Sequence, residues 1–233
     1  MAVRETFVRR RAAKLAAGAG VLALALVLTA CAGAAPSAGP AAGEQTAPSD
    51  AAANDTPQAG GRDLSEGGSC VDGEDIVIAA AGSSAVVDGP CGTVTISGAD
   101  FGGNIESAES VEVFGANASV LGAEWGEARV LADGVTLNVD SVQRLVTEAA
   151  GTHLTTQRAG EIVIDGDGDG DGDGATVNGG EAERVMLNAN DATVVLTAIT
   201  GALEVHGDRN IVNWTSGVEA PTADTGAENV YTH

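Results

Sequence analysis

A chain of 233 residues with 33 acidic and 11 basic side chains carries a formal net charge of −22. Beyond residue 30 the imbalance is larger, because six arginines and no lysine face 32 acids there. A protein this acidic repels phosphate backbones and anionic headgroups, which excludes nucleic acid as a partner.

Residues 1–30 have the layout of a secretory signal peptide. Five basic residues precede an apolar stretch, Leu15 to Ala30, that is shorter than the roughly 20 residues of a transmembrane helix. It ends in Leu28-Thr29-Ala30-Cys31, which resembles the lipobox of bacterial lipoproteins. The resemblance implies cleavage before Cys31 and a diacylglycerol on its thiol, and two acyl chains suffice for stable anchoring. We therefore expect a lipoprotein anchored through Cys31 to the cell membrane, on its extracytoplasmic face. A short transmembrane helix is the alternative.

Residues 31–66 predict a flexible linker behind the lipidated cysteine. They are mostly Ala, Gly, Pro, Ser, Thr and acids, with Leu64 as the one large apolar residue. Such a segment cannot bury enough surface to offset its ordering entropy. As a coil it would span roughly 30 Å, enough to hold a folded domain away from the lipid.

Two cysteines lie in the first part of the remaining segment, residues 67–233. With Cys31 assigned to lipid, Cys70 and Cys91 are an even pair in an oxidising compartment, which predicts a disulfide. A loop of this length would stabilise the fold by roughly 3 kcal/mol. Two free thiols or half of a metal site are the alternatives, although no histidine stands at zinc-like spacing from either cysteine.

Short apolar alternations recur through residues 67–233, and Gly, Asn or Asp follows most of them. This pattern predicts strands and turns, without helical periodicity. The last residues of successive strands are 16 to 18 residues apart, with one step of 23. The near-constant period predicts an all-β fold, a parallel β-solenoid (β-helix-like repeat) of about 18 residues per coil. A β-sandwich is the alternative, but it usually needs more aromatic residues. The predicted stacking anchors are Ile78, Ile96, Val113, Val130, Val146, Ile164, Leu187, Val205 and Ala223.

The 23-residue step contains an alternation of aspartate and glycine, with acids at Asp165, Asp167, Asp169, Asp171 and Asp173. Calcium takes six to eight oxygen ligands from a pliable loop, which this run resembles. Counted from Asp167, however, position 12 is Asn178 rather than a bidentate Glu, and flanking helices are not predicted. We expect at most weak calcium binding here and no other cofactor. The alternative is a low-complexity insertion at a solenoid turn.

Two segments of the sequence resemble a known family. One is Gly207-Asp208-Arg209-Asn210-Ile211-Val212-Asn213-Trp214-Thr215-Ser216-Gly217, followed by residues 225–230, and the other is residues 91–98. They resemble an uncharacterised repeat family, a domain of unknown function, of actinobacterial secreted lipoproteins. The resemblance covers roughly residues 70–233 and is strongest at the two ends. It implies a secreted β-repeat with Cys70 as the partner of Cys91, and it implies no activity.

Catalytic motifs are missing from the sequence. There is no Gly-x-Ser-x-Gly and no His-Glu-x-x-His, and His153 and His206 fall at different points of the predicted coil. We therefore expect a non-enzymatic binding, adhesion or surface-structure module whose partner is an envelope polysaccharide or a protein. The alternative is a calcium-assisted carbohydrate-active enzyme with an arginine base, drawn from Arg129, Arg144, Arg158 and Arg184. An aligned acidic and basic groove would favour the enzyme.

Overall fold

The structure, a computed structural model, describes residues 60–166 and 174–233. Every regular element in those two ranges is a β-strand, and no helix occurs in them. The strands are β1 (Arg62–Asp63), β2 (Gly68–Ser69), β3 (Glu74–Ile78), β4 (Ser84–Ile96), β5 (Gly102–Val113), β6 (Ser119–Val130), β7 (Thr136–Thr147), β8 (His153–Ile164), β9 (Thr176–Leu187), β10 (Thr193–Val205), β11 (Ile211–Gly217), β12 (Ala223–Asp224) and β13 (Val230–Thr232).

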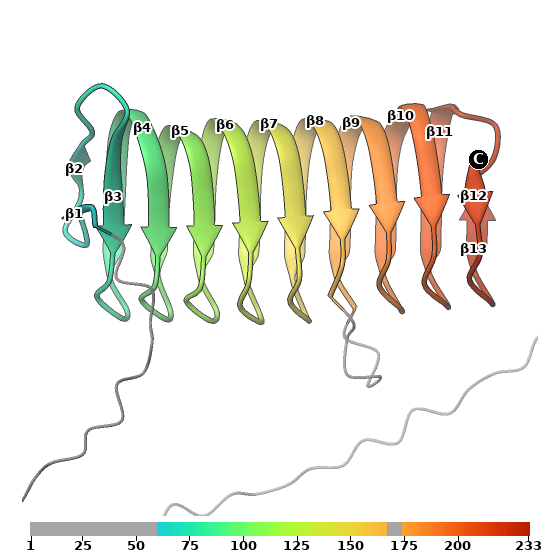
Figure 1. The fold of residues 1–233 in the computed structure, drawn as a ribbon, viewed down its shortest axis with the longest axis horizontal. Helices are drawn as coiled ribbons and strands as arrows, with labels where there is room; N and C mark the ends of the chain where they lie inside the picture. Colours follow the sequence, from blue (N-terminus) through green and yellow to red (C-terminus); the bar gives the residue numbers. More distant parts are fainter. Residues whose placement is uncertain (1–59, 167–173) are drawn as a thin grey trace, which may run out of the picture. The chain divides into compact units, whose positions relative to one another are not determined.

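The strands coil in sequence order along one axis (Figure 1). From β3 to β11 each strand pairs in parallel with the next, and β13 pairs with β11. Partners are 17 residues apart between β5 and β6, β6 and β7, and β7 and β8, and 18 apart between β10 and β11. The predicted parallel β-solenoid is therefore confirmed, with about 17 residues per turn rather than 18.

Each coil is one long strand that bends, followed by a tight turn. In β5, residues 102–105 belong to a back wall, 106–109 to a corner and 110–113 to a front wall; the turn is 114–118. The front wall carries the arrowheads that face the viewer in Figure 1. Side chains alternate between the two faces of each wall, as the pleat requires. Those pointing into the coil are fully or almost fully buried; in β5 they are Ile105, Ala108, Val111 and Val113.

Stacked apolar side chains form the core. The register places most of the predicted anchors in one row, and each member of the row is fully buried. Each anchor thus packs on the coils before and after it, which is the way a solenoid buries apolar surface. The confirmed members are Ile78, Ile96, Val113, Val130, Ile164, Leu187 and Val205.

One anchor, Val146, is wrong by one residue. Val130 pairs with Thr147, and Val146 lies on the opposite face of the strand. Thr147 is fully buried, and its hydroxyl oxygen lies 3.3 Å from that of Thr152. A hydroxyl group that has a hydrogen-bond partner is tolerated in an apolar stack. The prediction took Val146 because it is more apolar than Thr147, and hydrophobicity was the wrong criterion here.

Two glycines make room for the two largest fully buried side chains, Trp125 and Phe101. A Cβ on Gly122 would lie 2.2 Å from Cζ2 of Trp125, and one on Gly103 would lie 2.3 Å from Cζ of Phe101. Both aromatic residues are 1% exposed, and the Trp125 indole donates a hydrogen bond to the Ile105 carbonyl at 3.1 Å. Each bulky residue therefore occupies the volume that a glycine leaves free.

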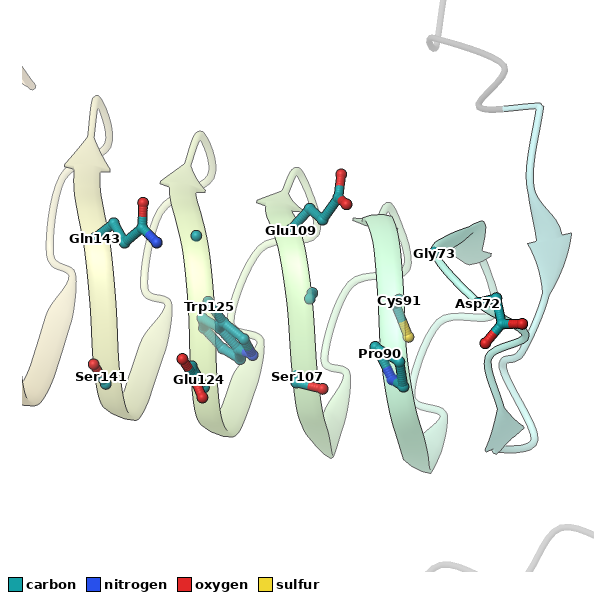
Figure 2. Close-up of a pocket in the computed structure, with 12 residues that line it drawn as sticks. Asp72, Gly73, Pro90, Cys91, Ser107, Glu109, Glu124, Trp125, Ser141 and Gln143 are labelled. Atoms are coloured by element: carbon teal, nitrogen blue, oxygen red, sulfur yellow. The ribbon is translucent and has the colours of Figure 1, made fainter.

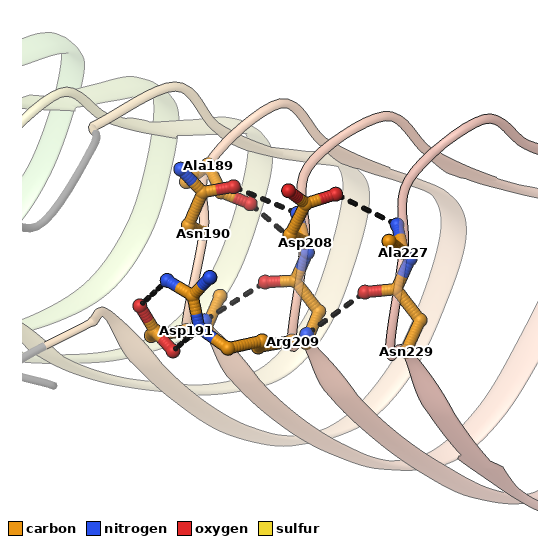
Figure 3. Close-up of polar contacts among 9 residues, drawn as sticks. Ala189, Asn190, Asp191, Asp208, Arg209, Ala227 and Asn229 are labelled. Atoms are coloured by element: carbon orange, nitrogen blue, oxygen red, sulfur yellow. Dashed lines mark hydrogen bonds and ion pairs between the residues drawn. The ribbon is translucent and has the colours of Figure 1, made fainter. Parts of the chain in front are cut away.

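Side-chain amides join the turns near the C-terminal end (Figure 3). The side-chain oxygen Oδ1 of Asn210 accepts a hydrogen bond from the backbone N–H of Ala192 at 2.8 Å. The Nδ2 group of Asn210 donates to the backbone carbonyl of Ala189 at 2.9 Å. Asn229 repeats both bonds one coil later, accepting from the Asn210 amide and donating to the Gly207 carbonyl. These bonds satisfy turn backbone groups that the strand ladder does not reach.

The N-terminal coil starts earlier than predicted. β1 pairs with β3 and β2 pairs with β4, and Leu64 is 5% exposed within the core. Strand β1 thus lies inside the segment expected to be linker. Cys70 and Cys91 form the predicted disulfide, with their Cα atoms 5.2 Å apart.

The C-terminal coil differs by one residue from the predicted register. Val205 pairs with Asp224, so the predicted anchor Ala223 is wrong by one position. The Tyr231 side chain packs against the core, and the Trp214 ring lies 5.2 Å from the His233 ring. Trp214 belongs to β11 and Tyr231 to β13, so the two aromatic residues lie in neighbouring coils at this end.

Candidate binding face

The two outer walls of the solenoid differ sharply in charge. On the front wall, carboxylates and guanidinium groups of successive coils form ion pairs. Arg144 contacts Glu127 at 3.0 Å and Glu161 at 2.9 Å, and Arg129 contacts Glu148 at 2.7 Å. Exposed pairs of this kind contribute little to stability. They do make the front wall an ionic, well-solvated surface.

The outer surface of the back wall carries no Asp, Glu, Lys or Arg. It consists of two rows of residues that are in register from coil to coil, and we call these rows the neutral face. The first row is Ser84, Gly102, Ser119, Thr136, His153, Thr176, Thr193, Ile211 and Val230. The second row is Val86, Asn104, Leu121, Asn138, Thr155, Asn178, Val195, Asn213 and Thr232. In a domain this rich in acids, a wall without charge is the most distinctive feature of the surface.

Exposed aliphatic side chains gather on the neutral face. These side chains are between 40% and 56% exposed, and among the described residues Val71 is the one exposed large apolar side chain elsewhere. Single exposed apolar residues need no explanation, but five on one face make that face the candidate interaction surface. They are Val86, Leu121, Val195, Ile211 and Val230.

Two hollows border the neutral face where the strands bend. One, of about 310 Å³, is lined by Asn104, Leu121 and Asn138 of the face together with Glu106 and Asp140. The other, of about 630 Å³, is lined by Asp140, Gln157, Arg158, Gly180, Glu181 and Thr197. Arg158 is the one arginine of residues 60–166 and 174–233 that makes no ion pair with a carboxylate.

A third hollow, of about 680 Å³, follows the corner of the N-terminal coils (Figure 2). Asp72, Glu109 and Glu124 contribute carboxylates, beside Ser107 and Gln143. No basic side chain lines it, and no group of three or more metal-ligating side chains occurs in the described part of the chain. Nothing in this hollow forms a nucleophile–base pair, so its chemistry is that of a shallow acidic surface.

Several predicted site residues lie outside the described ranges. Cys31 is one, and so are Asp167, Asp169, Asp171 and Asp173. Asp165 is described: its carboxylate accepts a hydrogen bond from the Asn188 amide. The β8–β9 partners are 23 residues apart, which places the aspartate–glycine run between these two strands as expected. Calcium binding by the run stays a prediction.

The histidines lie apart, as the predicted coil requires. His153 belongs to the neutral face, whereas the His206 Nδ1 lies 3.0 Å from the Thr225 hydroxyl, beyond the end of the front wall. Sequence reasoning missed the neutral face itself. The sequence did contain a signal for it. When the chain is written in lines of 17 residues, residues of one row fall in one column, and some columns contain charged residues while others contain none.

No protein-family model, curated protein or solved structure matches this chain. The described ranges contain no helix of the length and apolar character needed to cross a bilayer.

Proposed function

We propose that this protein is a membrane-tethered, non-enzymatic binding module that holds an extended, uncharged envelope polymer on its neutral face. The main support is the difference in charge between the two walls. Carboxylates and arginines occur on the outer surface of the front wall and are missing from that of the back wall. Binding surfaces lose water from their centre, and a charged side chain there would have to be desolvated. Hydroxyl, amide and aliphatic groups avoid that cost.

The borders of the neutral face favour an uncharged partner over a second copy of the chain. Asp88, Glu106 and Asp140 lie along the corner side, and Asp100 and Asp133 along the turn side, all of them exposed. Two copies facing each other would bring these acidic margins together. Like charges at close range oppose such an assembly, whereas a neutral chain lying between the margins meets no repulsion.

The membrane part of the proposal rests on the signal peptide and lipobox. A lipid on Cys31, followed by the linker, would display the solenoid on the extracytoplasmic face of the cell membrane. The resemblance to secreted actinobacterial lipoproteins supports the same location. A rod displayed in this way can lie alongside a polymer of the envelope.

Adding charge to the neutral face tests the proposal. Full-length chain in detergent micelles is sedimented with a panel of insoluble, uncharged polysaccharides, and we expect it to be retained on at least one. Thr155→Asp with Asn178→Asp should weaken retention about tenfold or more, the equivalent of 1.4 kcal/mol. Ser110→Asp with Gln143→Glu adds the same charge elsewhere and should leave retention unchanged. Failure of every polymer to retain the wild type, or equal loss in both variants, would overturn the proposal.

A carbohydrate-active enzyme is the second candidate, and the hollow around Arg158 favours it. Arg158, which forms no ion pair with a described carboxylate, lines this hollow together with Asp140 and Glu181. The other three candidate bases are engaged, because Arg129, Arg144 and Arg184 pair with glutamates of neighbouring coils. The sedimentation samples separate the two candidates. A bound polymer that keeps its chain length supports the binding module, and shortening that Arg158→Gln abolishes would establish the enzyme.

A further inference from the structure

Asparagine recurs on every second coil in the second row of the neutral face. Asn104 is in register with Leu121, Leu121 with Asn138, Asn138 with Thr155, and Thr155 with Asn178. Val195 and Asn213 continue the alternation. Because neighbouring strands are about 4.8 Å apart, the amide recurs about every 9.6 Å along the solenoid.

The amides of this row are unoccupied, unlike the asparagines elsewhere in the domain. Asn117, Asn188, Asn210 and Asn229 each bond to a side chain or a backbone group of an adjacent coil. Within the described residues, no such bond holds the side chain of Asn104, Asn138, Asn178 or Asn213. Each therefore offers two N–H donors and a carbonyl acceptor to a partner.

We propose that the neutral face binds an extended β-1,4-linked glycan lying parallel to the solenoid axis, with one disaccharide for every two coils. The proposal rests on the function proposed above and names its substrate class. In such a glycan successive sugars face opposite ways, so equivalent hydroxyl groups recur once per disaccharide, over a length close to two coils. The asparagines would bond to those hydroxyls. The aliphatic residues between them, such as Leu121 and Val195, would pack on the C–H faces of the rings.

We expect the glycosidic linkage to determine binding as much as the identity of the sugar does. An α-1,4-linked chain of the same sugars coils, so its hydroxyls cannot stay in step with a straight row of amides. The row from Asn104 to Asn213 spans six strand spacings, about 29 Å. It can therefore engage roughly three disaccharides, and a longer chain gains nothing further.

The test uses full-length chain in detergent micelles and isothermal titration with soluble oligosaccharides. Cello- and chito-oligosaccharides provide the β-1,4 series, with malto-oligosaccharides as the α-1,4 control. We expect affinity for the β series to rise with length up to about six sugars and then level off. The α series should bind at least about tenfold more weakly, a difference of 1.4 kcal/mol.

A permuted variant isolates the spacing of the amides. Asn138→Thr combined with Thr155→Asn keeps composition and charge but breaks the two-coil repeat. We expect it to bind the longest β-linked chain about tenfold more weakly while unfolding at the same urea concentration. Equal affinity for the α and β series, or unchanged binding by the permuted variant, would overturn this inference and leave the proposed function standing. If no uncharged glycan, soluble or insoluble, binds the wild type, both proposals fall.

Discussion

At the scale of single residues, the turns depend on one left-handed position that recurs from coil to coil. Gly82, Gly134 and Gly151 occupy it with φ between 61° and 69°. Non-glycine residues hold the same conformation in other coils, with φ between 56° and 60°: Asp100, Asn117, Asp191, Arg209 and Glu228. The backbone N–H of this residue bonds to a carbonyl of the next coil, for example Asp100 to Ala116 at 2.8 Å. Asp and Asn tolerate this conformation better than most residues, which explains the turn signals in the sequence.

A carboxylate in the last coil gives a pH-dependent prediction. The hydrogen bond from the Tyr231 hydroxyl, at 2.8 Å, holds the pKa of Asp224 below its ordinary value, and Asn229 adds a second bond at 3.0 Å. A depressed folded-state pKa contributes stability above the unfolded value near 3.9, and that stability is lost as pH falls through the folded value. We expect Tyr231→Phe to raise the Asp224 pKa, measured by NMR titration of the carboxyl carbon.

Asp191 provides the internal control for that titration. Its pKa is held low by the Arg209 guanidinium, in the coils that precede Asp224, so Tyr231→Phe should leave it unchanged. If the Asp224 pKa is the same in wild type and variant, the tyrosine hydroxyl does not stabilise the carboxylate, and acid weakening of the last coil has another origin.

At the scale of elements, neighbouring strands are joined by more than their backbone ladder. The corner row alternates glycine with a long polar residue, as in Glu109, Gly126, Gln143 and Gly160. A Cβ on Gly126 would lie 2.5 Å from the Glu109 carbonyl oxygen, and one on Gly160 would lie 2.5 Å from that of Gln143. The solenoid therefore repeats chemically over two coils at the corner, as it does in the asparagine row of the neutral face.

Asn210, which precedes β11, gives the prediction at this scale. It is fully buried, and replacing it with leucine removes the partners of the Ala192 N–H and the Ala189 carbonyl. A buried polar group left without a partner costs about 1–3 kcal/mol, so Asn210→Leu should lower the free energy of unfolding by about 3 kcal/mol. Urea denaturation measures it. The control is Asn213→Leu on the exposed side of β11, expected within about 0.5 kcal/mol of wild type. If Asn210→Leu lowers the free energy of unfolding no more than Asn213→Leu does, the Asn210 hydrogen bonds do not stabilise the fold.

At the scale of the whole molecule, the solenoid is a stack of nearly equivalent coils in which each coil contacts only its neighbours. Stability in such an array is the sum of coil terms and interfaces between neighbours. The disulfide joins Cys70 to β4 at one end, and Trp214 and Tyr231 pack into the coil at the other. Between these ends, we expect units of two coils to be interchangeable, because the corner row repeats over two coils.

Deleting two register steps tests that architecture. Removing residues 119–152 joins Ala118 to His153, which occupies the same register position as Ser119, and it keeps a glycine, Gly160, after Glu109 in the corner row. We expect a folded protein with a single unfolding transition and a urea m-value about a fifth smaller, because two coils fewer are exposed on unfolding. Removing residues 119–126 instead would bring front-wall residues into back-wall positions and should abolish the cooperative transition. If the two deletions behave alike, the coils are not the units of folding.

The sequence by itself determined what depends on local spacing. The period of apolar residues favoured a solenoid over a sandwich, because coils of constant length keep Ile96, Val113 and Val130 in one stack. Two cysteines left over in a chain with a predicted export signal favoured the disulfide, which the structure contains. The tertiary structure decided what depends on the direction of each side chain. A register error of one residue exchanges the two faces of a strand, so Val146 and Thr147 could not be told apart by hydrophobicity. The neutral face was recognised only in the structure, although its period is present in the sequence, because residues of one row lie 17 or more positions apart and meet only when the coils stack.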